Sequence, residues 1–168
     1  TTEIYTLSLH DALPISQIGT ATPDHVIRTK QKPLLLNLQQ LQDPDKLREE
    51  VSQALNAYCA SYHQYFESNN SGVDKIELDR LPRVVLVAGL GLVTIGKTVK
   101  ETRISADIYQ HSIDIIHKSF SLGDYVPLGS SDLFDMEYWS LEQAKLGKSK
   151  ALPRSEEHTS ELQSHLNL

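Results

Sequence analysis

The stretch at 82–118, PRVVLVAGLGLVTIGKTVKETRISADIYQHSIDIIHK, decides the fold of this chain. Its first apolar run, 84–87, is rich in β-branched residues and too short to span a membrane, which predicts a buried strand. Gly89 and Gly91 interrupt that run, and apolar residues resume at 92–95. We therefore expect two short strands on either side of a glycine-centred bend or bulge.

A helix is predicted to follow at 98–122. Thr98 and Glu101 match a T-x-x-E capping box, which satisfies backbone N–H groups where a helix begins. Gly123 is a typical residue just past a helix end. Helical spacing gives this segment one packing face: Ile108, Tyr109, Ser112, Ile113, Ile116 and Phe120.

The same stretch also contains the phosphate-loop pattern G-x-x-x-x-G-K-[ST] at 91–98. In such a loop Lys97 would contact the outer phosphates and Thr98 a magnesium ion. However, residues 92–95 are Leu-Val-Thr-Ile, and β-branched residues resist the positive φ angles of a curled loop. A P-loop-like nucleotide-binding protein is therefore the weaker alternative.

Helical periodicity recurs on both sides of the 82–118 stretch. Asp43 and Pro44 are suited to the N-cap and first position of a helix over 43–67. Its aromatic residues fall at helical spacing and predict a packed seam with phenol groups at a wet rim. Residues 133–146 form a further segment with Gly147 as its stop, and its acids are ordinary complements of a helix dipole.

These elements predict an α/β layer structure. Its sheet is expected to be short and mainly antiparallel, with an edge strand at 33–36 and a brief pairing at Val26 and Ile27. The helices at 43–67 and 98–122 each have one apolar face, so we expect them to cover that sheet.

One basic loop supplies the candidate site residues. Arg28 and Lys30 are candidate phosphate contacts, and His25 is a candidate metal ligand. The alternative interpretation is a solvated basic loop, because a lone histidine has no partner ligand at metal-site spacing. No catalytic residue is predicted.

The two ends differ in character from the interior. Residues 1–16 and 154–168 resemble translated sequencing-adapter sequence, so we expect them to be exposed extensions flanking a partial domain at 17–153. The chain has a formal net charge of −6, and each end carries −2, which leaves a nearly balanced interior. A nearly balanced charge does not indicate that the interior binds nucleic acid or an anionic membrane through electrostatic attraction. A single cysteine, Cys59, is consistent with a reducing compartment.

Three stretches carry a resemblance to a known family: PDHVIRTK at 23–30, PRVVLVAGLGLVTIGKT at 82–98 and DLFDMEYWSLEQAKLGK at 132–148. Together they resemble bacterial fusions of a class II (adducin-type) sugar-phosphate aldolase with a short-chain dehydrogenase, of the rhamnulose-1-phosphate aldolase/alcohol dehydrogenase type. The resemblance implies a class II aldolase/adducin-like α/β lobe from the region between the two enzymes. It also implies a cytoplasmic location.

One position departs from the family pattern. Class II aldolases carry a zinc-binding histidine before the second glycine of the bend, and Leu90 stands there in this chain. A leucine cannot bind zinc. We therefore expect a non-catalytic lobe that holds no cofactor, with zinc and NAD confined to the parent protein. The catalytic fragment of a zinc-dependent aldolase is the alternative. Expected partners are the remaining aldolase and dehydrogenase regions and, in a homo-oligomer, further copies.

Overall fold

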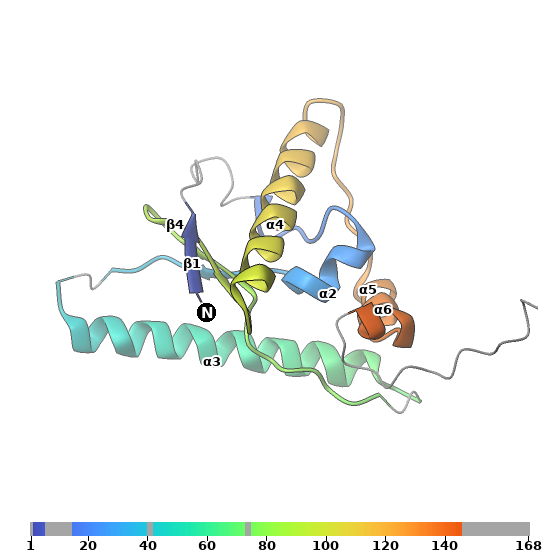
Figure 1. The fold of residues 1–168 in the computed structure, drawn as a ribbon, viewed down its shortest axis with the longest axis horizontal. Helices are drawn as coiled ribbons and strands as arrows, with labels where there is room; N and C mark the ends of the chain where they lie inside the picture. The colour runs from blue at the N-terminus through green and yellow to red at the C-terminus, as the bar shows by residue number, and fades with distance from the viewer. Residues whose placement is uncertain (1, 6–14, 40–41, 73–74, 146–168) are drawn as a thin grey trace, which may run out of the picture.

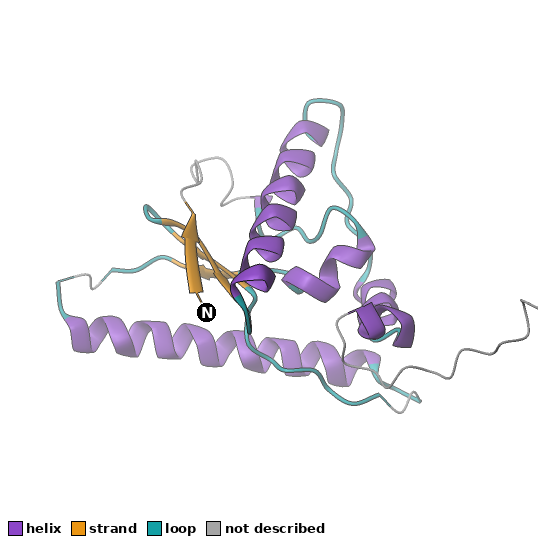
Figure 2. Cartoon of the chain, in the orientation of Figure 1, coloured by secondary structure: helices purple, strands orange, loops and turns teal. Residues whose placement is uncertain are grey.

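The computed structural model describes residues 2–5, 15–39, 42–72 and 75–145. In chain order its elements are β1 (Thr2–Tyr5), the 3-10 helix η1 (Pro23–His25), α2 (Val26–Thr29), β2 (Leu34–Leu36), α3 (Pro44–Asn69), β3 (Val84–Val87), β4 (Gly91–Ile95), α4 (Val99–Ser119), α5 (Ser130–Glu137) and α6 (Ser140–Lys145). The fold is α/β, with a small sheet between long helices (Figure 1; Figure 2).

The sheet has the strand order β1-β4-β3-β2. β4 pairs antiparallel with both β1 and β3, whereas β2 pairs parallel with β3. The predicted mainly antiparallel sheet is therefore confirmed, and so is the prediction that the strand after Pro33 lies at an edge. Because side chains alternate along a strand, successive residues of β3 enter different layers of the core.

One face of the sheet packs against α4. Val84, Leu86 and Leu92 form a buried cluster with Ala106, Tyr109 and Ile113 of that helix. The opposite face packs against α3, where Val85 and Val87 join Leu34, Leu36 and the partly buried Val51, Leu55 and Tyr58. Both predicted covering helices are confirmed, and they lie on opposite sides of the sheet as three layers (Figure 1).

A third cluster, made of aromatic residues, joins the end of α3 to α5. Phe66, Phe134 and Tyr138 are buried together, with Tyr65 beside them. The Phe134 and Tyr138 rings stack with centroids 4.5 Å apart. Such ring pairs stabilise by about 0.5–1.5 kcal/mol beyond their area of burial. This cluster fixes α5 against α3, away from the sheet.

Local signals placed the helix starts well and the helix ends less well. Asp43 caps α3 by accepting hydrogen bonds from the Asp45 and Lys46 backbone N–H groups at 3.1 and 3.2 Å. Thr98 caps α4 by accepting from the Glu101 N–H, but the Glu101 side chain accepts from the Lys97 N–H rather than from that of Thr98. α4 ends at Ser119, three residues before the expected end.

Two expected segments have a different structure. Val26 and Ile27 lie in the short helix α2, not in a strand, because Val26 is buried among helices and its carbonyl accepts the Lys30 N–H. The segment predicted as one helix at 133–146 consists of two helices. α5 begins at Ser130 and ends before Tyr138, and α6 begins at Ser140. Gly147 and residues 154–168 lie outside the described part of the chain.

The expectation that residues 1–16 are exposed is wrong for part of that segment. β1 pairs with β4 from Thr2↔Ile95 to Tyr5↔Leu92, Ile15 packs against the α4-side core, and Ser16 is only 2% exposed. The physical reason is that β4 has an open edge whose N–H and C=O groups accept any extended strand of β-forming sequence. The adapter origin of this segment remains a prediction.

Candidate functional site

Leu90 lies at the tip of the hairpin that joins β3 to β4. Its N–H donates to the Val87 carbonyl at 3.0 Å, which closes a tight turn. Gly89, at the third position of that turn, has φ of +76°, a conformation that favours glycine. The Leu90 side chain is 54% exposed. The bend predicted from the two glycines is thus confirmed, and it presents an apolar side chain where the resemblance expects a metal-binding imidazole.

The histidines of the described chain do not assemble a metal site. Within residues 2–5, 15–39, 42–72 and 75–145, no group of three or more His, Cys, Asp and Glu side chains is arranged to hold a metal ion. His63 Nδ1 lies 3.1 Å from the Glu77 carboxylate, and His117 is on the exposed face of α4. Zinc requires three or four such ligands that converge. The residues described here therefore do not fit a zinc ion.

His25, the candidate metal ligand, packs against α4. Its Nδ1 lies 3.1 Å from the Ser112 hydroxyl oxygen. Burial lowers the pKa of the His25 imidazole, the nearby Asp24 carboxylate opposes that change, and His111 adds to it. His25 therefore favours its neutral form and helps to fix η1 on α4.

Lys30 lies inside the molecule rather than on a surface loop. Its side chain is 5% exposed, and its ammonium group donates to the Asp79 carbonyl at 2.7 Å and lies 3.7 Å from Glu137 Oε1. Lys30 is also the one non-glycine residue with positive φ in the described chain, at 66°. Such backbone costs about 1–3 kcal/mol and persists only where surrounding contacts hold it. Lys30 is therefore not available to a phosphate group at the surface. Arg28 lines a surface groove that Lys30 does not line, so the two residues do not form one phosphate site.

The partners of Lys30 form a buried polar network. The Tyr62 hydroxyl donates to Glu137 Oε1 at 2.8 Å and lies 2.9 Å from the Tyr138 hydroxyl. Lys30 Nζ also sits 3.5 Å from the centroid of the Tyr62 ring. Burial raises the pKa of the Glu137 carboxyl, while Lys30 and Tyr62 work in the other direction. The network joins α2, α3 and α5 at one point.

Sequence reasoning missed this network. Glu137 was interpreted, with the other acids of its segment, as an ordinary complement of the helix dipole, yet its side chain is 1% exposed and accepts a hydrogen bond from Tyr62. The Tyr62 phenol lies inside the molecule rather than at a wet rim. One signal was present: Glu137 follows Leu133 and Phe134 at helical spacing, which places it on the apolar face of α5. Its partner Lys30 could not be identified, since no local pattern links residues so far apart.

Arg28 lines a surface groove of about 500 Å³ between α2, the segment before β3 and the beginning of α4. Its carbonyl accepts a hydrogen bond from the Ser105 hydroxyl at 3.3 Å, which ties α2 to α4. Lys97 lines the same groove. Two residues that were selected on separate grounds as phosphate contacts, Arg28 in the basic loop and Lys97 in the phosphate-loop pattern, thus share one groove.

The phosphate-loop pattern itself does not form a phosphate loop. Residues Gly91–Ile95 form β4, in register with β3 on one side and β1 on the other. Their backbone groups belong to the strand ladder, so they do not curl into a cradle of inward-pointing N–H groups. The unfavourable β-branched composition of 92–95 predicted this outcome.

With the fold and these positions described, comparison with known proteins identifies the class. The family profile for "Aldolase class II, second domain" matches residues 4–146, and the chain belongs to that family. The match begins within the segment that resembles adapter sequence. The chain is also 34% identical over 133 residues to the "Uncharacterized oxidoreductase YuxG" of Bacillus subtilis (strain 168), an alignment that covers 79% of this chain and 19% of that protein. This chain thus spans about a fifth of the length of that relative.

No helix among the described residues is long and apolar enough to cross a membrane.

Proposed function

We propose that this chain is a non-catalytic aldolase-like lobe of a larger enzyme, in which a class II sugar-phosphate aldolase is fused to a short-chain dehydrogenase of rhamnose-type sugar catabolism. The match of residues 4–146 to the class II aldolase family supports the aldolase part of this proposal. A relative that is named an oxidoreductase, and of which the chain covers 19%, supports the fusion. In this proposal zinc and NAD bind other regions of the parent protein, which are also the partners of this lobe.

Leu90 is the observation that carries the non-catalytic part of the proposal. Aldol cleavage by this class of enzyme uses a metal ion to stabilise the enediolate, and a metal needs several converging N, O or S ligands. Leu90 supplies an alkyl group at the tip of the β3–β4 hairpin, and no three His, Cys, Asp or Glu side chains of the described residues are grouped so that they could hold a metal ion. The lobe would then contribute packing surface to the parent enzyme rather than chemistry.

The test uses the full 168-residue chain. After equilibration with zinc and removal of unbound metal, mass spectrometry should find substoichiometric zinc, and cleavage of rhamnulose 1-phosphate should not exceed the background rate. Circular dichroism of the same sample establishes that the chain is folded. Stoichiometric zinc that is lost in His25→Ala and kept in His117→Ala, together with aldol cleavage, would replace this proposal with the catalytic-fragment alternative.

A further inference from the structure

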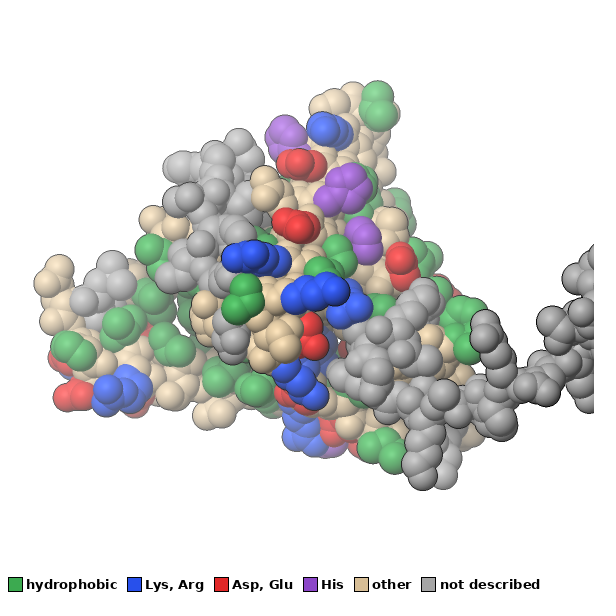
Figure 3. Space-filling model, viewed as in Figure 1, with side chains coloured by type: hydrophobic (Ala, Val, Ile, Leu, Met, Phe, Trp, Pro, Cys, Tyr) green, Lys and Arg blue, Asp and Glu red, His purple; other side chains and the backbone are tan. Residues whose placement is uncertain are grey.

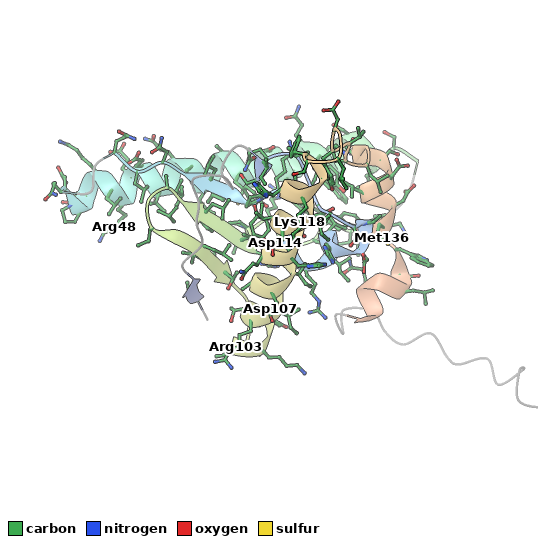
Figure 4. All side chains as sticks on the ribbon, turned by 90° about the horizontal axis from the view of Figure 1, so that it is seen from above. Arg48, Arg103, Asp107, Asp114, Lys118 and Met136 are labelled. Atoms are coloured by element: carbon green, nitrogen blue, oxygen red, sulfur yellow. The ribbon has the colours of Figure 1, made fainter. Side chains whose placement is uncertain are left out.

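β4 pairs with β1 along one side and with β3 along the other. β1 belongs to residues 1–16, the segment that resembles adapter sequence, and it lies at the border of the sheet (Figure 1; Figure 4). If that segment is foreign to the protein, β4 has no native partner on this side. The properties of β4 itself therefore indicate whether the strand is suited to an edge or to the interior of a sheet.

β4 has the composition and burial of an interior strand. Residues 91–95, GLVTI, contain no charge and no proline, and they pair with both neighbours in unbroken register. Leu92 and Thr94 are fully buried, and on the other face Val93 and Ile95 are partly buried against the α3-side core. Natural edge strands are very short or carry lysine, proline or a bulge, which prevents other chains from pairing with them. β4 has none of these protections.

Two other surfaces of the lobe have the features that β4 lacks. β2, the strand at the opposite border of the sheet, is three residues long and follows Lys32 and Pro33. The exposed face of α4 carries charged side chains, among them Arg103, Asp107 and Lys118 (Figure 4), and Figure 3 shows charged side chains along this helix. These two surfaces are suited to water, whereas the outer side of β4 is suited to a further strand.

The chain that leads into Gln17 passes close to this side of β4. Ile15 packs against the α4-side core, and Ser16 is almost fully buried. β1 also contacts α4, the helix that covers this core. The family profile begins at residue 4, so members of the family have sequence ahead of position 17 that belongs to this domain. A segment of the parent protein that directly precedes position 17 is therefore within reach of β4.

We infer that the outer edge of β4 is the acceptor for a strand of the parent protein, supplied by the segment that directly precedes position 17 there. In this chain β1 takes the place of that strand. A substitute is accepted because strand addition uses backbone N–H and C=O groups, which every sequence carries. The native strand runs antiparallel to β4, as β1 does, with apolar residues at the alternate positions beside Leu92 and Thr94. The inference rests on the proposed function only in that the lobe belongs to a larger protein.

Amide hydrogen exchange, followed by NMR on the full chain, measures the pairing of this edge. The Ile95 N–H donates to the Arg83 carbonyl at 2.9 Å, on the β3 side. Because N–H groups alternate in direction along a strand, the Val93 N–H also points toward β3, and those of Leu92 and Thr94 point toward β1. The exchange rates of Leu92 and Thr94 therefore report the outer edge, and those of Val93 and Ile95 are an internal control.

Two proline variants establish whether β4 binds β1 through the backbone. Glu3 lies opposite Thr94, so Glu3→Pro removes an N–H that donates to β4. Exchange at Leu92 and Thr94 should become about tenfold faster or more, the effect of losing this pairing. Ile4→Pro is the matched control, because the N–H at position 4 points away from β4, and it should change these rates much less.

The parent segment is tested once the uninterrupted reading frame has been recovered from the source DNA. In a chimera, the sixteen parent residues before position 17 replace residues 1–16 of the full chain. Exchange at Leu92 and Thr94 should be as slow in the chimera as in the present chain. The same segment, added as a synthetic peptide to the Glu3→Pro variant, should restore slow exchange, and this second measurement does not require the chimera to fold.

Fast exchange at Leu92 and Thr94 in the chimera and also with the peptide would overturn the inference. A recovered frame that contains residues 1–16 would overturn it too, because β1 would then be the parent's own strand. Equal effects of Glu3→Pro and Ile4→Pro would mean that β4 does not accept a strand through its backbone. Zinc binding or aldol cleavage would overturn the non-catalytic proposal and leave this inference unaffected, so the two fail separately.

Discussion

The Lys30 ammonium nitrogen lies 3.7 Å from Glu137 Oε1, with both side chains almost fully buried. The pair joins the end of α2 to the end of α5. Tyr62 of α3 contacts both members, because its hydroxyl donates to Glu137 and its ring faces the Lys30 ammonium group. Removing one member of a buried ion pair leaves the other charge without a partner in a region of low dielectric constant. This generally costs more than replacing both members together.

Lys30→Met alone and Glu137→Leu alone should each lower the free energy of unfolding by about 3–5 kcal/mol. The double variant should be less destabilised than the sum of the two single variants. Urea denaturation of the four proteins in a double-mutant cycle measures this coupling. The exposed pair Arg48 and Asp45, 3.4 Å apart on α3, is the control and should show coupling near zero. Additive losses at Lys30 and Glu137 would mean that their contact contributes nothing.

Gly89→Ala should lower the free energy of unfolding by about 1–2 kcal/mol, because a Cβ disfavours the φ of +76° at this position. No steric clash contributes, since the added Cβ has no neighbour within 4 Å. Gly123→Ala is the matched control: the site is equally open and its φ is not in the left-handed region. Thermal unfolding of both variants tests the assignment, and an equal effect at the two glycines would contradict it.

Deletion of residues 1–5 should lower Tm, because it removes β1 and leaves the β4 edge unpaired. Deletion of 154–168 should leave Tm nearly unchanged if this segment is the extension that its sequence predicts. Differential scanning calorimetry of the two truncations measures both effects. An unchanged Tm in the first truncation would show that β1 adds no stability, despite its pairing. Recovery of the uninterrupted reading frame from the source DNA tests the adapter origin independently.

His25 should make the stability of the chain depend on pH. Burial lowers its folded-state pKa below the ordinary value of 6.5, so the unfolded chain binds a proton more readily than the folded chain. Stability should therefore fall as the pH drops below about 6.5, and the fall should end once the pH is below the folded-state pKa. His25→Gln should flatten this part of a Tm-against-pH profile, and the exposed His117→Gln should not. Asp24 and His111 lie near His25 and stay in place in both variants.

Local patterns in the sequence were sufficient for much of the fold. The two apolar runs and the two glycines between them predicted the β3–β4 hairpin, because strand pairing across a short bend involves residues that are close in sequence. The starts of α3 and α4 were predicted from Asp43 and Thr98, whose side chains cap N–H groups two or three residues away. The absence of a phosphate loop also followed from the sequence, since Val93, Thr94 and Ile95 are β-branched and favour extended backbone.

Only the tertiary structure determined which distant residues meet. β1 was set aside as an extension, yet the open edge of β4 pairs with it through backbone groups that every sequence carries. Glu137 and Lys30 are paired because the aromatic cluster docks α5 on α3, and no local rule links their positions. Arg28 and Lys97 share a groove for the same reason: the packing of α2 against α4 brings together two residues whose separation along the chain gives no sign of contact.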